Sequence, residues 1–301
     1  MRRSIARRSR EPLMSDHIEL FAPAKINLTL EVKGRREDGF HEIESLMAPI
    51  SLFDRIEIAH QGDEEIALAC DDPTLPCGDD NLVVKAAKLF CDSFGFVPKL
   101  RITLSKRIPH GAGLGGGSSD AASVLLGLNE LFETDLSRSV LADLAAELGS
   151  DVPFFIYQSA AMIRGRGERV EPVSFPHRLP LLLVKPPFGV PTPWAYSRWR
   201  DSRPIPGILY QRQELPWGAV VNNLERPVFE KHLFLAQLKV WLLDQPEVSG
   251  ALMSGSGATV FAVLREKEQG YLLGDRIAEE FGTELWAYLC ETVAHDVQLT
   301  A

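Results

Sequence analysis

The hydrophobic pattern of this 301-residue chain changes period several times. Apolar residues that alternate with polar ones predict β-strands, which are most frequent in the first third of the chain. The strand predictions cover residues 18–32 (two strands broken at Pro23), 42–50, 54–60, 66–70, 99–106, 160–164, 181–185, 250–253, 258–264 and 284–289. Apolar residues that recur every three or four positions predict helices over residues 82–94, 121–132, 139–148, 227–243 and 266–281. We therefore expect an α+β fold.

Prolines are concentrated between residues 172 and 193, and this change in composition predicts a boundary between two domains. The length and the hydrophobic content of 45% are sufficient for two buried cores. We expect a first domain over residues 15–178 and a second over residues 179–301. The arginine-rich start of the chain predicts a disordered tail over residues 1–14, with Met14 as an alternative start of translation.

Charge and composition exclude several classes of partner. The net charge of −9 argues against a nucleic-acid-binding protein, which needs a basic surface. No apolar run approaches the roughly 20 residues that span a bilayer, so we expect no membrane partner. The cysteines form no C-x-x-C pair and have no histidine at metal-ligand spacing, which favours reduced thiols and a cytoplasmic location; they are Cys70, Cys77, Cys91 and Cys290.

A glycine- and serine-rich segment, Pro109–Asp120, lies between a predicted strand and a predicted helix. Glycine permits backbone angles that other residues disfavour, so several N–H groups can converge on one anion, and the helix N-terminus adds a positive potential. The segment therefore predicts a cradle for phosphates, with a nucleoside triphosphate as the expected ligand.

Three other interpretations of this segment fit less well. The segment matches the G-x-G-x-x-G pattern of dinucleotide-binding proteins from Gly111 onward. Such a site also needs an acidic residue at the end of a second strand, whereas Glu133 and Asp135 follow a predicted helix. A P-loop requires a lysine after the glycines, and none is present. A flexible linker rarely joins an apolar strand directly to an alanine- and leucine-rich helix.

A second loop of the same composition, Ser254–Gly257, lies between two predicted strands. By itself it is typical of a plain hairpin turn. Together with the first loop it predicts two cradles, in separate domains, that close on a polyphosphate from both sides.

Three segments, residues 23–28, 109–119 and 254–258, together resemble the three motifs of the GHMP kinases. Residues 36–41 and 148–154 are similar to the branch of that superfamily that acts on 4-diphosphocytidyl-2-C-methyl-D-erythritol. The resemblance implies ATP-dependent phosphorylation of the 2-hydroxyl of this substrate, in the non-mevalonate route to isoprenoid precursors. It also implies a ribosomal-S5-like N-terminal domain and a ferredoxin-like C-terminal domain.

An aspartate and a lysine in one cleft can accept the proton of an alcohol and neutralise charge on a transferred phosphoryl group. The resemblance assigns these roles to Asp151 and Lys25. From the residues alone, Asp151 could equally be a helix cap and Lys25 an ordinary surface lysine whose alkyl chain is buried.

The expected ATP site takes its residues from the first loop and from positions that line the adenosine site in relatives. The predicted residues are Asn81, Lys106, Pro109, Gly111, Gly113, Leu114, Gly115, Gly116, Gly117, Ser118 and Ser119. Asn81 could also be only a helix cap. Phosphoryl transfer requires charge neutralisation, so we expect Mg²⁺ to arrive with ATP, assisted by the hydroxyl of Ser118 or Ser119 or by Asp151. The sequence contains no dedicated metal-ligand cluster.

The expected substrate site stacks aromatic rings on a cytosine base and uses polar groups for the rest of the molecule. Its predicted residues are Asn27, Phe40, His41, Thr192, Tyr196, Ser254, Gly255, Ser256 and Gly257. Phe40 replaces a tyrosine that is frequent in relatives, and Asn223 replaces an aspartate in a segment that we interpret as structural.

Two alternatives remain open at this point: a GHMP kinase for another alcohol, such as a mevalonate-type substrate, and a catalytically silent binding protein of the same fold. We expect a small-molecule substrate as the partner and a monomer or homodimer.

Overall fold

The computed structural model describes residues 17–61 and 66–293. Its strands are β1 (His17–Asn27), β2 (Thr29–Arg35), β3 (His41–His60), β4 (Ile66–Cys70), β5 (Leu100–Ser105), β6 (Ala161–Gly165), β7 (Arg169–Pro172), β8 (Pro180–Lys185), β9 (Gln213–Leu215), β10 (Gly218–Asn222), β11 (Val248–Met253), β12 (Val260–Leu264) and β13 (Trp286–Glu291). Its helices are α1 (Leu82–Phe94), α2 (Gly116–Leu131), α3 (Arg138–Leu148), α4 (Val152–Tyr157), α5 (Thr192–Arg198), α6 (Glu225–Lys231), α7 (Leu233–Leu243) and α8 (Gln269–Phe281). The expected tail over residues 1–14 lies outside the described residues.

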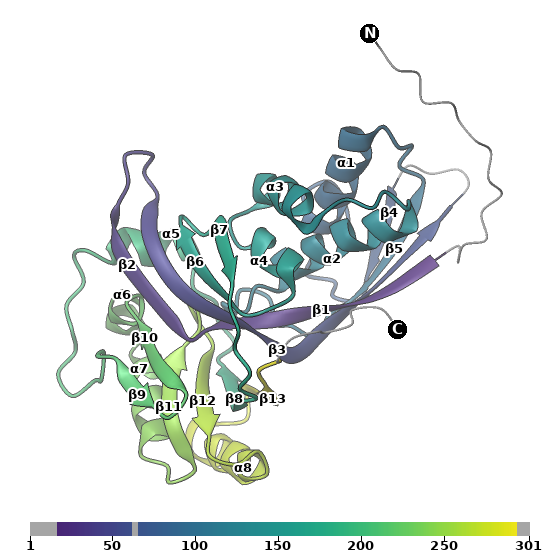
Figure 1. The fold of residues 1–301 in the computed structure, drawn as a ribbon. Coiled ribbons are helices and arrows are strands. Elements are labelled where there is room, and N and C mark those ends of the chain that lie inside the picture. Colours follow the sequence, from purple (N-terminus) through teal and green to yellow (C-terminus); the bar gives the residue numbers. More distant parts are fainter. Residues whose placement is uncertain (1–16, 62–65, 294–301) are drawn as a thin grey trace.

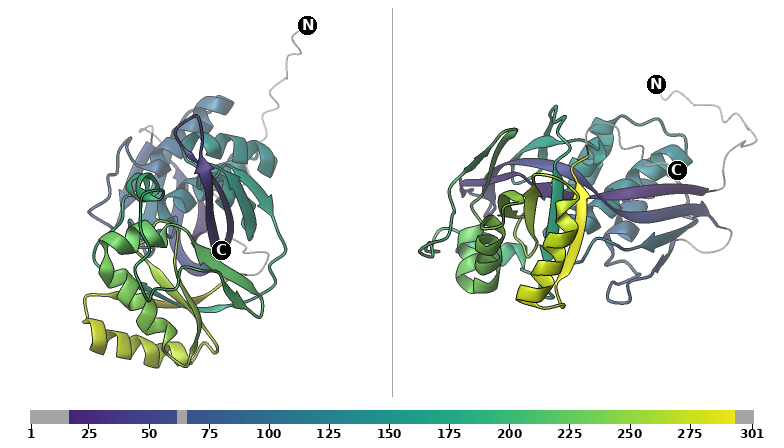
Figure 2. Two further views of the ribbon diagram at one scale, coloured as in Figure 1. Left: turned by 90° about the vertical axis from the view of Figure 1, so that its left-hand side faces the viewer. Right: turned by 90° about the horizontal axis from the view of Figure 1, so that it is seen from below.

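In the described part of the chain, the strands form a nine-stranded sheet and a four-stranded sheet (Figure 1). The larger sheet has the order β4-β5-β3-β2-β10-β9, and β1 and β6 also pair with β3. The smaller sheet has the order β11-β12-β8-β13. Helices α1 to α4 gather on the larger sheet, whereas α7 and α8 pack against the smaller one (Figures 1 and 2). The predicted α+β class is therefore confirmed.

The long strand β3 replaces two predicted strands, because burial continues to alternate through Ser51–Phe53 and pairing with β1 continues on both sides of a register shift there. The predicted helix 227–243 is instead two helices, α6 and α7, which meet at His232 in a non-helical conformation. Helix α2 begins five residues earlier than predicted, because Gly115 adopts a left-handed conformation and directs the chain into the helix at Gly116. The sequence analysis missed the short elements α4, α5, β7, β9 and β10.

The two sheets share a core rather than lying apart. Ala24 and Ile26 of β1 belong to the same buried cluster as Leu181 of β8 and Phe261 of β12. Strand β10 follows the predicted boundary at residues 178/179, yet it pairs in parallel with β2 of the larger sheet. The second sheet does begin at β8, so the boundary stays a prediction.

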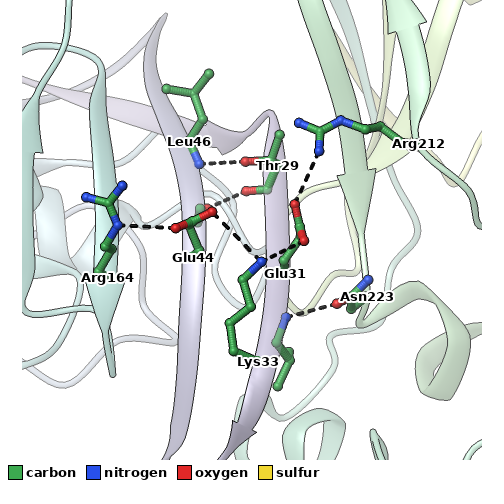
Figure 3. Close-up of polar contacts among 10 residues, drawn as sticks. Thr29, Glu31, Lys33, Glu44, Leu46, Arg164, Arg212 and Asn223 are labelled. Atoms are coloured by element: carbon green, nitrogen blue, oxygen red, sulfur yellow. Dashed lines mark hydrogen bonds and ion pairs between the residues drawn. The ribbon is translucent and has the colours of Figure 1, made fainter.

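The junction between β2, β3, β6 and β10 is also held by polar contacts on the sheet surface (Figure 3). Glu31 and Lys33 of β2 form an ion pair of 2.8 Å, and Glu44 of β3 accepts from Arg164 of β6 at 3.2 Å. Asn223, directly after β10, accepts a hydrogen bond from the backbone N–H of Val32 at 2.9 Å. Exposed ion pairs contribute at most about 1 kcal/mol each, so buried packing provides most of the stability of this junction.

Candidate active site

A cavity of about 490 Å³ lies where the loops of the two sheets meet. It is lined by β1, by the loops around residues 75–82 and 106–118, and by the loop at residues 255–256. A second, larger hollow of about 1160 Å³ lies beside it, lined by residues 34–43 and by α5. Asp151, Thr192 and Tyr196 line both hollows. The two spaces therefore meet at Asp151.

Lys25 and Asp151 face each other where the hollows meet. The Lys25 ammonium lies 3.8 Å from a carboxylate oxygen of Asp151. The Lys25 side chain is almost fully buried, whereas 43% of the Asp151 side chain is exposed. Burial lowers the pKa of Lys25, and the charge of Asp151 opposes this shift only in part. The geometry thus presents a buried cation next to an accessible carboxylate.

Asp151 occupies the N-cap position of α4, but its side chain accepts no capping hydrogen bond. The helix-cap interpretation of this carboxylate is therefore not supported, and its oxygens remain available to a ligand.

A chain of hydrogen bonds holds Lys25 from behind. Its ammonium donates to the side-chain oxygen of Asn27 at 2.6 Å, and the Asn27 amide donates to the hydroxyl of Ser45 at 2.8 Å. Ser45 in turn donates to the backbone carbonyl of Thr29. Because all members of this chain are buried, the ammonium has a fixed position at the cavity wall.

The glycine loop follows the backbone geometry that the sequence predicts for a phosphate cradle. Gly111, Gly113 and Gly115 all have positive φ angles, of 62°, 74° and 74°. A methyl group on Gly115 would lie 2.8 Å from the ring of Phe155 and 3.1 Å from the Lys25 side chain. Only glycine fits here, and backbone angles of this kind permit several N–H groups to converge on an anion.

The two predicted serines differ in their surroundings. Ser118 lines the cavity at the start of α2, but Ser119 does not. The Ser119 hydroxyl is fully buried and has no hydrogen-bond partner among the described residues. Ser118 is therefore the serine placed to reach a phosphate or a metal ion.

Asn81 is the N-cap of α1 and also lines the cavity. Its side-chain oxygen accepts from the backbone N–H of Val83 at 2.9 Å. Its place in the cavity wall is compatible with the predicted role in ATP binding, which stays a prediction.

Lys106 lines the cavity but is tied to two carboxylates that the sequence analysis missed. Its ammonium contacts Asp54 of β3 and lies 2.6 Å from Asp120 of α2. Burial opposes the charge of Lys106, but the two carboxylates outweigh it and raise the lysine pKa. Burial likewise raises the pKa of Asp120. Only the fold brings these residues together, since Lys106 is 52 positions from Asp54 and 14 positions from Asp120.

The larger hollow has aromatic walls. The imidazole of His41 lies 5.4 Å from the ring of Tyr196, tilted by 33°, and 6.1 Å from the ring of Trp199 in an edge-on arrangement. Phe40 is 49% exposed, with the Arg166 guanidinium 5.1 Å above its ring. Burial, assisted by the charge of Arg35, lowers the pKa of His41 and favours its neutral form. These flat, open surfaces suit a nucleobase.

Trp199, Arg166 and Arg35 were not among the predicted residues. Trp199 lies three positions after Tyr196, on the same side of α5, and this spacing is the signal that could have identified it.

The loop after β11 closes the cleft from the side of the smaller sheet. Gly255 and Ser256 line the cavity, and the Ser256 hydroxyl lies 2.8 Å from that of Thr192. Ser254 and Gly257 line neither hollow. Ser254 instead donates to the backbone carbonyl of Gly113 at 2.9 Å and joins the two glycine loops.

Two family models match the chain: the GHMP kinases N terminal domain over residues 81–159 and the GHMP kinases C terminal domain over residues 209–283. The 4-diphosphocytidyl-2-C-methyl-D-erythritol kinase of Methylacidiphilum infernorum is 43% identical over 281 residues, which cover 92% of this chain and 97% of that protein. The enzyme of the same name from Syntrophotalea carbinolica is 39% identical, over 88% and 96% of the two chains.

The chain belongs to the 4-diphosphocytidyl-2-C-methyl-D-erythritol kinase family, within the GHMP kinases. A crystal structure of 4-(cytidine 5'-diphospho)-2C-methyl-D-erythritol kinase, 36% identical, aligns with a TM-score of 0.75 over 92% of this chain and 100% of its own. A homoserine kinase from Cytophaga hutchinsonii, 17% identical, aligns at 0.66 over 95% and 98% of the two chains and shows a shared fold. The predicted family and its GHMP fold are confirmed.

Within residues 17–61 and 66–293, no group of three histidine, cysteine or acidic side chains is placed to hold a metal ion. A search of the same residues for a helix long and apolar enough to cross a membrane finds none.

Proposed function

We propose that the protein transfers the γ-phosphoryl group of ATP to the 2-hydroxyl of 4-diphosphocytidyl-2-C-methyl-D-erythritol, in the non-mevalonate route to isoprenoid precursors. One observation carries this proposal: two hollows with different walls meet at the pair Lys25 and Asp151. One hollow is walled by the glycine loop and suits ATP, and the other is walled by aromatic rings and suits the cytidine end of the substrate. The reacting groups would then meet at Asp151.

Within this arrangement Asp151 accepts the proton of the attacking hydroxyl as the new O–P bond forms, and ADP leaves with the electrons of the broken bond. Lys25 supplies positive charge next to the transferred group. Because Lys25 is held by Asn27 on its buried side, it faces the cavity without reorganisation. The partly exposed carboxylate remains accessible to the substrate hydroxyl.

Mg²⁺ supplies charge neutralisation on the phosphates when it is bound with ATP. The residues present suit this ion, because it prefers oxygen ligands and retains several waters. Two oxygen donors that line the cavity, the Ser118 hydroxyl at the start of α2 and the Asp151 carboxylate, would hold it.

The cytidine end of the substrate is assigned to His41 and Tyr196, with Phe40 as an outer wall. A mevalonate-type substrate has no base to stack, so this aromatic hollow disfavours the alternative of another small alcohol. Lys25 and Asp151 are both present and face each other, which disfavours a silent binding protein. Occurrence in the cytoplasm and as a monomer or homodimer remain predictions.

The test is ADP release from ATP and Mg²⁺ with 4-diphosphocytidyl-2-C-methyl-D-erythritol, compared with mevalonate, galactose and homoserine. We expect turnover with the cytidine substrate alone. Asp151→Asn should lower kcat by about 10²–10⁴-fold, with the KM for ATP within about threefold of wild type.

Asp201→Asn is the matched control, because Asp201 is a second aspartate that lines the larger hollow. Turnover of another alcohol would overturn the substrate assignment. An Asp151→Asn variant as active as Asp201→Asn would remove Asp151 from the chemistry.

A further inference from the structure

The loop Ser254–Gly257 is held by a buried polar cluster that takes no part in the proposed chemistry. This cluster consists of Asn222, at the end of β10, and Glu225, at the start of α6, with Lys239 of α7 behind them. At most 1% of each of these residues is exposed. Buried polar groups are retained at a cost, and here each one has a specific partner.

Asn222 is bonded on every polar side of its amide group. Its nitrogen donates to the carbonyls of Met253 and Gly255, at 2.7 and 2.8 Å. Its oxygen accepts from the backbone N–H of Leu224 at 2.8 Å. A reversed amide would turn its oxygen toward two carbonyl oxygens, so the hydrogen bonds allow a single orientation.

Glu225 binds the other side of the same peptide segment. One carboxylate oxygen accepts from the backbone N–H of Met253 at 2.9 Å, and the other accepts from Lys239 at 2.6 Å. Met253, the last residue of β11, therefore has its N–H bound by Glu225 and its carbonyl bound by Asn222. The loop that follows begins from a fixed point.

The position of this loop matters because Gly255 forms a wall of the reaction centre. A Cβ atom placed on Gly255 would lie 3.3 Å from the Lys25 ammonium, from the Asn27 side-chain oxygen and from the Gly113 carbonyl. The Gly255 carbonyl, which Asn222 binds, belongs to the same residue. One amide group thus connects the junction of the two sheets to the backbone beside Lys25.

We propose that Asn222 is a positioning residue for phosphoryl transfer, which acts by fixing the backbone of Gly255 against Lys25 and the glycine loop. This inference rests on the proposed function. A displacement of about 1 Å at a reacting centre can cost about 100-fold in rate, whereas binding spread over two large hollows tolerates it better. Loss of the Asn222 contacts should therefore reduce kcat more than it weakens binding.

The neighbouring Asn223 supplies a matched control. It lies at the same sheet junction, but its side-chain oxygen accepts from the N–H of Val32 on β2 and does not contact the loop (Figure 3). Asn223→Asp keeps that acceptor. Asn222→Asp makes the same chemical change one residue earlier and replaces a donor that faces two carbonyls.

The experiment compares the full-length wild type, Asn222→Asp, Asn222→Ala and Asn223→Asp, each at a temperature well below its own unfolding transition. It measures kcat per titrated active site, and the Kd of CDP and of a non-hydrolysable ATP analogue. For both Asn222 variants we expect kcat to fall by about 10–100-fold and both Kd values to stay within about threefold. Asn223→Asp should match wild type. The alanine variant provides the result if the aspartate variant does not fold.

Three outcomes would overturn the proposal: an unchanged kcat per active site in a folded Asn222 variant, losses of affinity as large as the loss of kcat, or the same loss of kcat in Asn223→Asp. Absence of turnover in the wild type would instead refute the proposed function, and this result is read before any variant is compared.

Discussion

Gly115 is a position where the fold and the cleft compete for space. The substitution Gly115→Ala adds a methyl group at a residue with φ of 74°. That conformation costs a residue with a side chain about 1–2 kcal/mol. The methyl would also lie 2.8 Å from Phe155 and 3.1 Å from Lys25, well inside normal contact distance. Overpacking of this kind costs about 1–3 kcal/mol. The sum is about 2–5 kcal/mol. This is a large fraction of the free energy of unfolding of a folded domain, which is about 5–15 kcal/mol.

The assay is unfolding of the ligand-free protein, by heat and by urea, together with steady-state kinetics. At about 2–4 °C per kcal/mol, Gly115→Ala should lower the Tm by about 4–20 °C. It should also reduce kcat, because relief of the clash displaces Lys25.

Gly117→Ala is the control for Gly115→Ala. This glycine lines the same cavity within α2, and a Cβ there would meet only Leu82, at an ordinary 3.7 Å. Alanine stabilises a helix by up to about 1 kcal/mol relative to glycine, so the Tm of this variant should be unchanged or higher. A Gly115→Ala variant as stable as wild type, or a Gly117→Ala variant that is equally destabilised, would refute the argument.

Two further predictions concern the walls of the cleft. Tyr196→Ala should raise the KM for the cytidine substrate by about 5- to 150-fold and leave the KM for ATP unchanged, because loss of one base–aromatic stack costs about 1–3 kcal/mol. An unchanged substrate KM would remove Tyr196 from the pocket. Burial holds the pKa of Asp120 above its usual range, so the folded protein keeps a proton that the unfolded chain loses. The free energy of unfolding should therefore fall as the pH rises from about 4, the usual aspartate pKa, toward that raised value. Urea titrations at several pH values should show a weaker dependence of this free energy on pH in Asp120→Asn. An equal pH dependence in both proteins would contradict this.

The sequence predicted best where chemistry lies in a continuous segment. The glycine loop appears in the structure with positive φ angles at Gly111, Gly113 and Gly115, which glycine adopts without the steric cost that a side chain would add. Lys25 and Asp151 are 126 positions apart, and the resemblance to a family, rather than periodicity, paired them; the structure places them 3.8 Å apart. Their roles in the reaction remain predictions.

The missed features depend on tertiary contacts. Helices α4 and α5 have six and seven residues, too few for a clear helical period, and each has a proline in its first turn. Strand β9 has three residues and β10 five, and β10 is stabilised by its pairing with β2. Lys106 was predicted at the ATP site, but its ion pairs with Asp54 and Asp120 were not, since only the packing of α2 on the larger sheet brings the three together.

The cleft also accounts for the weaker charge pairing of one buried lysine, Lys25, in contrast to another, Lys239. The Glu225–Lys239 pair is fully buried, and each of its charges has hydrogen-bond partners. At the glycine loop, in contrast, the pKa of Lys25 is lowered by burial, although its ammonium donates to Asn27 and lies 3.8 Å from the partly exposed Asp151 carboxylate. A buried cation whose charge is only partly compensated destabilises the ligand-free fold, but it becomes favourable once an anion lies beside it. The same cost would be unexplained in a purely structural lysine, so the electrostatics of Lys25 themselves favour a site made to receive a polyphosphate.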